Sequence, residues 1–237
     1  MTNQERPESL EGRWDILYRD YPEVYEEWGK IPMLPDFLDV MLKRFSLEGK
    51  TVLDVAAGTG VSTFGLAAHA DLVIGVEPQD AMMELAIAKG RQQGVTNVRF
   101  EIGVAEDLPL SRDSVDAAIA FTAGGDVAKT AEEMERVVRP GGFVLRADVA
   151  PGWYGGDVNR AVAGDPSEIP REGSRDYILA GLGYDFFDVP MVQDYDSVEQ
   201  AVRTYGFIHG KKHIDYIRAN NVTMIRWKAR ARFKMVP

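Results

Sequence analysis

The stretch Val52-Leu53-Asp54-Val55-Ala56-Ala57-Gly58-Thr59-Gly60 decides the fold of this chain. Three of its first four residues are apolar, which predicts a buried strand, and a helix is expected shortly afterwards, over 61–70. Between the two, Gly58 and Gly60 allow a sharp turn and let a ligand approach the backbone without an intervening Cβ. A strand, a glycine turn and a helix in this order predict a ligand-binding turn at the end of a strand.

An acidic residue, Glu77, stands about 20 residues after this strand, where the next predicted strand (72–76) ends. At that place a carboxylate can accept hydrogen bonds from the two hydroxyls of a ribose. The glycine turn and the acid occur together at the required spacing. We therefore favour a nucleoside-containing ligand over an ordinary turn without one.

Two classes of cofactor use this geometry, and neighbouring residues separate them. A dinucleotide turn requires a third small residue three positions after its second glycine, where this chain has Thr63. Asp54 precedes the turn, and its negative charge would oppose a pyrophosphate but suits the α-amino group of a sulfonium ligand. These residues favour S-adenosylmethionine, and an NAD-dependent oxidoreductase is the alternative.

Strand and helix patterns continue to alternate along the chain. Further strands are predicted over 98–102, 115–121 and 143–149, and further helices over 81–93 and 128–138. Such alternation implies βαβ units and a parallel sheet that is covered on both faces. The predicted fold class is α/β, with a doubly wound, Rossmann-like, mostly parallel sheet of seven strands and an N-terminal helical cap.

We expect one domain over 1–237, because a chain of 237 residues with 45% hydrophobic residues can bury one sizeable core. Its parts are an N-terminal helical cap (1–48), a cofactor-binding core (51–150), an insertion or lid (151–183), and C-terminal strands and helices (184–237). The cap is expected to hold amphipathic helices over 8–30 and 35–45, and the insertion a helix over 171–182. In the C-terminal part, strands are expected over 184–192 and 222–236, with helices over 198–205 and 211–220.

The composition excludes several kinds of chemistry. The chain has no cysteine, so disulfides, iron–sulfur clusters and thiol nucleophiles are absent, and we predict no metal site. With 37 acidic and 27 basic residues the net charge is -10, which disfavours nucleic acid and anionic membranes as partners. The sequence shows no secretory leader and no apolar run long enough to span a bilayer. We expect a cytoplasmic protein that is a monomer or a homodimer.

Four segments in order resemble the class I S-adenosylmethionine-dependent methyltransferases over 51–149. Within that class, the chain is similar to the small-molecule group that includes the ubiquinone and menaquinone biosynthesis methyltransferases. The segments are the glycine turn, Gly75-Val76-Glu77-Pro78-Gln79-Asp80-Ala81-Met82, Gly103-Val104-Ala105-Glu106-Asp107-Leu108-Pro109-Leu110 and Val137-Val138-Arg139-Pro140-Gly141-Gly142-Phe143. The resemblance implies the fold and the cofactor, and it leaves the methyl acceptor open.

The resemblance also implies roles for individual residues. The methionine moiety would be surrounded by Asp54, Ala56, Gly58 and Gly60, and the ribose would be held by Glu77. The adenine would lie near Pro78, Met82, Val104, Ala105 and Glu106, and the methyl group near Phe121. The chain departs from the group at Val104, where many relatives have an aspartate, and at Ala123-Gly124-Gly125-Asp126, where a pair of histidines is common.

We therefore predict methyl transfer from S-adenosylmethionine to an oxygen, nitrogen or carbon atom of a small-molecule acceptor, with S-adenosylhomocysteine as product. In-line displacement needs no covalent residue, because holding donor and acceptor at attack distance supplies much of the catalysis. His209, His213 and Tyr25 are weak candidates for a catalytic base, and both histidines fall in a polar connector that is expected to be solvent-exposed. A non-catalytic S-adenosylmethionine-binding module remains a further alternative.

Two other patterns allow either a functional or a structural interpretation. The aromatic residues of the cap can line an acceptor pocket or dock the cap helices, and they are Trp14, Tyr18, Tyr21, Tyr25 and Trp28. In the last strand, Arg226, Lys228, Arg230, Arg232 and Lys234 alternate with apolar residues and so share one face. We interpret these five cations as a solvated face near a sheet edge, with binding of an anionic acceptor as the alternative.

Overall fold

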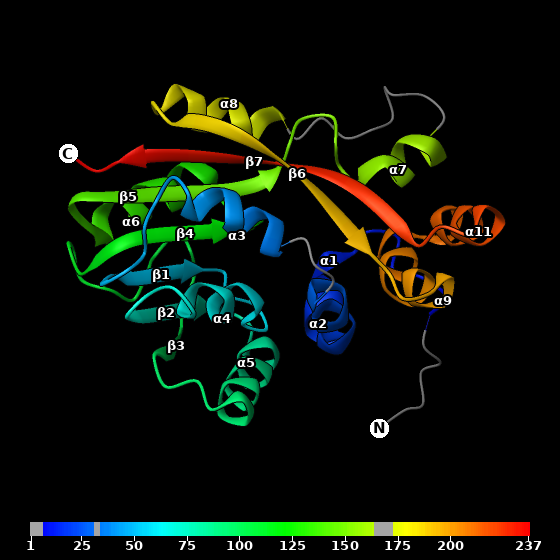
Figure 1. The fold of residues 1–237 in the computed structure, drawn as a ribbon, viewed down its shortest axis with the longest axis horizontal. Helices are drawn as coiled ribbons and strands as arrows, with labels where there is room; N and C mark the ends of the chain where they lie inside the picture. The colour runs from blue at the N-terminus through cyan, green and yellow to red at the C-terminus, as the bar shows by residue number, and fades with distance from the viewer. Residues whose placement is uncertain (1–6, 31–33, 164–172) are drawn as a thin grey trace.

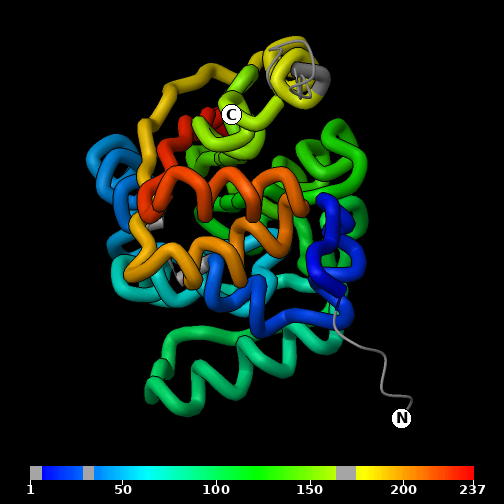
Figure 2. Tube along the Cα trace, turned by 90° about the vertical axis from the view of Figure 1, so that its right-hand side faces the viewer, coloured from blue at the N-terminus to red at the C-terminus, as the bar shows by residue number. Residues whose placement is uncertain are grey.

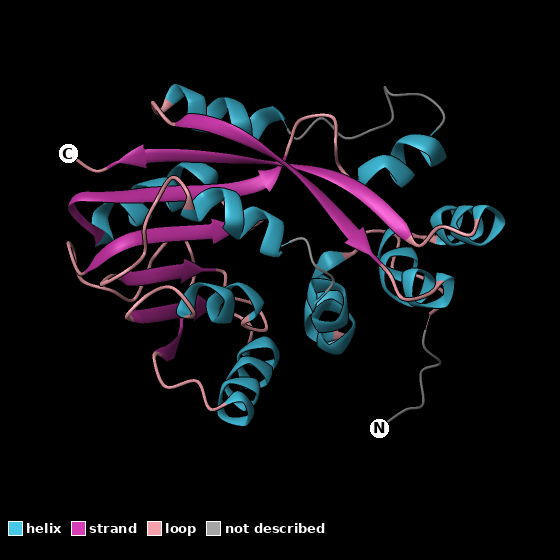
Figure 3. Ribbon diagram, viewed as in Figure 1, coloured by secondary structure: helices cyan, strands magenta, loops and turns pink. Residues whose placement is uncertain are grey.

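A seven-stranded sheet forms the centre of the molecule, in the order β3-β2-β1-β4-β5-β7-β6 (Figures 1 and 3). The computed structural model describes residues 7–30, 34–163 and 173–237. All neighbouring strands are parallel except β7, which runs antiparallel to β5 and β6. The predicted doubly wound, mostly parallel sheet is confirmed. Its strands are β1 (Thr51–Val55), β2 (Leu72–Glu77), β3 (Val98–Ile102), β4 (Val115–Phe121), β5 (Val138–Val149), β6 (Asp185–Asp194) and β7 (Met224–Met235).

Helices cover both faces of this sheet. One face packs against α3 and α4 through side chains such as Phe37, Met41 and Leu66, and the other face packs against α6 and α8 through Met134 and Leu179. The N-terminal and central helices are α1 (Trp14–Asp20), α2 (Pro22–Lys30), α3 (Leu34–Leu42), α4 (Val61–Ala67), α5 (Asp80–Gln93) and α6 (Val127–Val137). The later helices are α7 (Gly156–Ala163), α8 (Gly173–Gly181), α9 (Val198–Ala201), η2 (Val202–Gly206), α10 (Phe207–His209) and α11 (Lys211–Asn220).

The central strands carry apolar side chains on both of their faces, since helices pack against both faces of the sheet. Side chains of β1, β2 and β4 are almost all buried, as in other parallel sheets enclosed by helices. β1 pairs with β2 on one side and with β4 on the other, so the order of strands reverses at β1. Ligands of open α/β sheets bind outside the carboxyl ends of the strands at such a reversal.

The helices α1 and α2 lie beyond these carboxyl ends (Figure 1). Leu17 and Val24 of this pair pack against Phe207 and Ile208 in a small apolar cluster, which Leu10 completes. Figure 2 looks at this end of the molecule and shows the blue N-terminal helices beside the orange segment that contains α9–α11. The sequence predicted helices here, and the packing holds them next to the reversal point.

Several predicted boundaries differ from the structure. Within the predicted insertion a helix was expected only over 171–182, yet α7 also forms there. The helix predicted over 171–182 begins partly outside the described residues, and α8 accounts for its remainder. In the C-terminal part, the helix predicted over 198–205 continues without a break through η2 and α10 to His209.

The prediction of a solvated cationic face on β7 was wrong for most of the strand, although Arg226 is 64% exposed. β7 lies between β5 and β6 and is not an edge strand. The insertion and α6 cover its charged face, and four of the cations form ion pairs there: Arg226 with Asp157, Arg230 with Asp176 and Asp188, Arg232 with Asp176, and Lys234 with Glu135. The fifth, Lys228, lies over the ring of Trp153.

Candidate functional site

Two adjoining cavities open at the carboxyl ends of β1 and β4. The first surrounds the glycine turn, and we call it the loop cavity; the second is lined largely by aromatic rings, and we call it the aromatic cavity. Their empty volumes are ≈ 820 Å³ and ≈ 900 Å³, mouths included, which suits ligands the size of a nucleoside or a ring compound. Four residues border both cavities, namely Tyr25, Ala56, Phe121 and Thr122.

The loop cavity gathers nine of the eleven residues that the sequence assigned to a cofactor. These are Ala56, Gly58, Glu77, Pro78, Met82, Val104, Ala105, Glu106 and Phe121. They come from the ends of four strands, β1 to β4, and from the connections and the helix α5 that follow them. Tyr18, Gln79, Gly103 and the segment 122–125 also line this cavity and were not in the predicted set. Tyr25, a candidate base, completes the lining.

Glu77 is fixed in place at the end of β2. Its Oε2 accepts a hydrogen bond from the backbone N–H of Gly58 at 3.0 Å, and its Oε1 accepts one from Gln79 at 3.0 Å. Burial raises the pKa of this carboxyl above its ordinary value, although the two N–H donors act in the opposite direction. Each oxygen keeps a lone pair for a further donor, such as a ribose hydroxyl.

Asp54 and Gly60 lie behind the loop cavity and do not border it. Asp54 is fully buried, and its Oδ2 accepts hydrogen bonds from Ser62 at 2.7 Å and from Thr63 at 2.6 Å. Its Oδ1 is buried without a hydrogen-bond partner among the described residues. Loss of solvent raises the pKa of Asp54 to about 6, and this effect exceeds the opposing hydroxyl bonds.

Gly60 has a backbone requirement of its own. It adopts φ +82° directly before α4, and a Cβ at this position would lie 2.7 Å from the ring of Phe64. The residue is therefore needed for the turn and for close packing beneath it. Thr63, the departure from a dinucleotide turn, is explained by its hydrogen bond to Asp54.

Two residues at the border between the cavities have unusual backbones. Ala56 follows β1 with φ +61°, and Thr122 follows β4 with φ +50°. A left-handed conformation costs a residue with a Cβ roughly 1–2 kcal/mol, and such strain persists where the surroundings hold it, often at functional sites. Both residues lie where the two cavities meet, and their left-handed conformation bends the chain there.

The two departures from the family pattern lie on one wall of the loop cavity. Val104 is 46% exposed and carries no polar group that could contact an adenine amino group. The neighbouring Glu106 accepts a hydrogen bond from the backbone N–H of Asp126 at 2.7 Å through its Oε1. Glu106 thereby places a carboxylate beside the segment Ala123–Asp126, where the family often has histidines.

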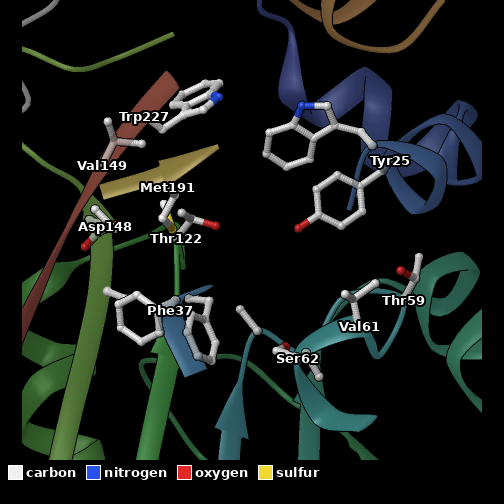
Figure 4. Close-up of a pocket in the computed structure, with 16 residues that line it drawn as sticks. Tyr25, Phe37, Thr59, Val61, Ser62, Thr122, Asp148, Val149, Met191 and Trp227 are labelled. Atoms are coloured by element: carbon white, nitrogen blue, oxygen red, sulfur yellow. The ribbon is translucent and has the colours of Figure 1, made fainter. Parts of the chain in front are cut away.

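The aromatic cavity is mostly apolar. Five rings line it, those of Tyr25, Trp28, Phe37, Phe121 and Trp227. Figure 4 shows the Tyr25 hydroxyl pointing into this cavity, opposite Thr122 and below Trp227. Of the described residues that line it, Asp148 is the only acidic or basic one. Of the lining residues, Ala56, Tyr25 and Phe121 were in the predicted set, and Trp28 was among the cap residues that could line an acceptor pocket.

The two candidate histidines lie outside both cavities, and neither is the exposed residue that the sequence predicted. His209 stacks on Tyr205 with ring centroids 4.0 Å apart, and the Nδ1 atom of His209 is 3.0 Å from the carbonyl oxygen of Tyr205. Burial lowers the pKa of His209 to about 3 and also lowers that of His213, whose Nε2 is 2.8 Å from Asn159 Oδ1. The third candidate, Tyr25, borders both cavities, and burial raises the pKa of its hydroxyl well above the usual value.

The aromatic residues of the cap serve both purposes that the sequence allowed. Tyr18, Tyr25 and Trp28 line the cavities. Tyr21 packs edge-on against Phe207, and Trp14 donates a hydrogen bond to the hydroxyl of Tyr154 at 3.4 Å. The cap is thus docked by some of its rings and contributes others to the cavity walls.

The fold and this arrangement define a class of protein. Residues 46–172, more than half of the chain, match a family model described as a methyltransferase domain. The chain belongs to the methyltransferase domain family.

Particular relatives match over shorter stretches. Over 115 residues the chain is 36% identical to the uncharacterized methyltransferase YcgJ of Bacillus subtilis, covering 47% of this chain and 46% of the relative. Over 102 residues it is 37% identical to a demethylmenaquinone methyltransferase of Clavibacter sepedonicus, covering 42% and 41% respectively. The chain therefore spans a little under half the length of these curated relatives.

Solved structures show the same fold at lower identity. The crystal structure of YcgJ from Bacillus subtilis aligns with a TM-score of 0.61 at 23% identity, over 84% of this chain and 97% of that one. A SAM-dependent methyltransferase from Aquifex aeolicus aligns with a TM-score of 0.57 at 18% identity, over 91% and 98%. In the described part of our chain, no helix is both long and apolar enough to cross a membrane.

Proposed function

We propose that this chain transfers the methyl group of S-adenosylmethionine to a small-molecule acceptor, with S-adenosylhomocysteine as the product. The observation that carries the proposal is the pair of adjoining cavities, one built around Glu77 and the glycine turn, the other around aromatic rings. They meet at Tyr25, Ala56, Phe121 and Thr122. A donor in one cavity and an acceptor in the other would face each other across this border, as in-line displacement requires.

The residues of the loop cavity fit S-adenosylmethionine, whose sulfonium supplies an electrophilic methyl group when it is bound. Glu77 would accept hydrogen bonds from the ribose hydroxyls, while Pro78 and Met82 would contact the adenine. Val104, Ala105 and Glu106 would border the edge of the adenine. Ala56 and Gly58 would allow the methionine moiety to approach the backbone, and Phe121 would lie near the methyl group.

Asp54 acts on the cofactor from behind the loop. Its unpartnered Oδ1 is a buried acceptor that nothing in the described chain satisfies. An α-amino group carries the positive charge and the N–H donors that such an oxygen lacks. We assign Asp54 to the cofactor's amino group, whose positive charge it would attract from behind the glycine turn.

We further propose that the acceptor is uncharged and largely apolar. The five rings and the aliphatic side chains of the aromatic cavity offer it contact area. The one charged group there, Asp148, is already paired with Arg146 at 2.7 Å and with Arg175 at 3.5 Å. The hydroxyls of Tyr25 and Thr122 orient the atom that is methylated, and positioning supplies most of the catalysis.

Calorimetric titration with S-adenosylmethionine, S-adenosylhomocysteine and NAD in parallel tests the cofactor. We expect the first two to bind and NAD not to bind. Glu77→Ala should weaken binding of S-adenosylhomocysteine by at least about 100-fold, because it removes two hydrogen bonds to a charged group, each contributing roughly 1.5–3 kcal/mol. Glu84→Ala, an exposed change on the adjacent helix α5, is the matched control and should leave the affinity unchanged.

The outcomes separate the alternatives. Binding of NAD alone would replace the proposal with an oxidoreductase. Binding of S-adenosylmethionine without turnover on a panel of apolar phenols, amines and enolizable ketones would favour a non-catalytic binding module. Silence from all three ligands would refute the cofactor site.

A further inference from the structure

A buried cation lies between the two cavities and lines neither of them. Arg146 is a residue of β5, and its side chain is only 2% exposed. Its Nε donates to Asp148 Oδ2 at 2.7 Å, and its Nη2 donates to the carbonyl oxygen of Ala123. Its Nη1 is buried and has no hydrogen-bond partner among the described residues. A buried charge is costly unless it is paired, so this guanidinium depends on the salt bridge with Asp148, the one ion pair that it forms with the described residues.

The two partners of Arg146 belong to different cavities. Ala123 lines the loop cavity, on the segment Thr122–Gly125. Asp148 lines the aromatic cavity beside Val149 (Figure 4). A chain of direct hydrogen bonds therefore runs from one cavity wall, through a single guanidinium, to the other.

The segment that receives this bond has three attachments. The backbone N–H of Thr122 donates to Ala147 at 2.7 Å, and that of Asp126 donates to Glu106 at 2.7 Å. The third attachment is the hydrogen bond from Arg146 to the Ala123 carbonyl, which lies between the other two along the chain. Without it, the middle of the segment loses its polar contact with the sheet while both ends remain attached.

We infer that Arg146 and Asp148 are positioning residues that couple the acceptor cavity to the cofactor cavity, an inference that rests on the proposed methyl transfer. The negative charge of Asp148 holds the guanidinium where it can donate to Ala123. When that charge is lost or turned away, Arg146 becomes an unpaired buried cation and moves toward other acceptors. The segment Thr122–Gly125 then loosens, and the cofactor cavity loses part of its wall.

The test is the affinity for S-adenosylhomocysteine in a variant outside the cofactor cavity. Asp148→Asn preserves shape and removes the charge, and Asp148 does not border the loop cavity. We expect it to weaken binding by about 5-fold or more, the lower end of measured coupling between sites. In an Arg146→Met background the same change should have little further effect, because the two residues act as one unit.

Asp176→Asn is the matched control. Asp176 pairs with Arg230 and Arg232 in the same charged cluster, and its ion pairs in the described part of the chain do not include Arg146. It should lower the urea midpoint of unfolding and leave the affinity for S-adenosylhomocysteine unchanged. If Asp148 had only a structural role, Asp148→Asn would likewise lower the urea midpoint and leave the affinity for S-adenosylhomocysteine unchanged.

The double variant Arg146→Met/Asp148→Asn leaves no unpaired buried charge, so it keeps the test usable if Asp148→Asn does not fold. It should also bind S-adenosylhomocysteine more weakly, because Ala123 has lost its donor. Folded variants that bind as tightly as the unmodified protein would overturn the coupling. Failure of the unmodified protein to bind would instead overturn the proposed function.

Discussion

The two buried carboxylates near the glycine turn have different surroundings. Glu77 accepts two backbone N–H groups and faces a cavity, whereas Asp54 accepts two hydroxyls and has no access to solvent. Burial raises the pKa of both, and that of Asp54 reaches about 6. A proton on Asp54 is therefore retained at a pH where an exposed aspartate is already ionised.

The raised pKa of Asp54 makes its contribution to the stability of the fold depend on pH. The pKa of Asp54 in the folded protein, about 6, is above its ordinary value of 3.8. Between these values the folded state holds a proton that the unfolded state has released, so the contribution of Asp54 to stability falls as pH rises from about 4 to 6. Above pH 6 the contribution no longer changes.

Cofactor affinity is expected to rise with pH, whereas the contribution of Asp54 to stability falls. An α-amino cation prefers ionised Asp54, so S-adenosylhomocysteine should bind roughly 10-fold more weakly at pH 5 than at pH 7, since a group with pKa 6 is about one-tenth ionised at pH 5. Calorimetry at pH 5, 6 and 7 measures this difference. Asp54→Asn should bind weakly with a flat profile, while Glu77→Gln should keep the slope. An unchanged slope in Asp54→Asn would show that another group titrates.

At the scale of elements, β7 shows how a charged strand becomes internal. Its apolar residues face the main core, and its cations face α6 and the insertion. Arg232 is only 8% exposed because Asp176 of α8 lies over it, with Nε and Nη2 donating at 2.7 and 2.8 Å. The bonds from Arg232 lower the pKa of Asp176, so this pair stabilises the fold above the ordinary pKa range of aspartate and weakens in acid.

Removing this carboxylate should therefore destabilise the fold. Asp176→Ala leaves two partly buried guanidinium groups without their shared partner, and we expect a loss of about 2 kcal/mol in the free energy of unfolding. Urea denaturation at pH 7 measures the loss. The matched control is Glu199→Ala, which breaks the exposed pair with Arg218 and should cost less than about 0.5 kcal/mol. Equal effects would mean that the cluster on β7 is no stronger than a surface pair.

At the scale of the whole molecule, the N-terminal cap joins distant parts of the chain. Its helices pack on Phe207 and Ile208, and Tyr25 borders both cavities. A ligand in those cavities contacts the cap as well as the sheet. Bound cofactor should therefore oppose opening of the cap, by an amount set by ligand concentration relative to Kd.

Limited proteolysis measures this effect. Trypsin cleavage after Arg13 and Arg19, both exposed, should slow by up to about 100-fold when S-adenosylhomocysteine is present at 100 times its Kd. Cleavage after Arg218 of α11, away from the cavities, serves as the internal control and should change less. Equal slowing at both places would indicate global stabilisation, and no slowing would show that the cap does not close on the ligand.

The sequence by itself determined the fold and most of the loop cavity, because both depend on short-range patterns. Alternating strands and helices specify the sheet, and the glycine turn with Glu77 at its fixed spacing marks one end of it. Only the tertiary structure decided what surrounds the second cavity. Phe37, Asp148 and Trp227 come from segments far apart in the chain, and each belongs to an apolar or alternating pattern that any core residue would satisfy. The same limit explains β7: alternation predicts which residues share a face, but the packing of other elements decides whether that face meets water or a carboxylate.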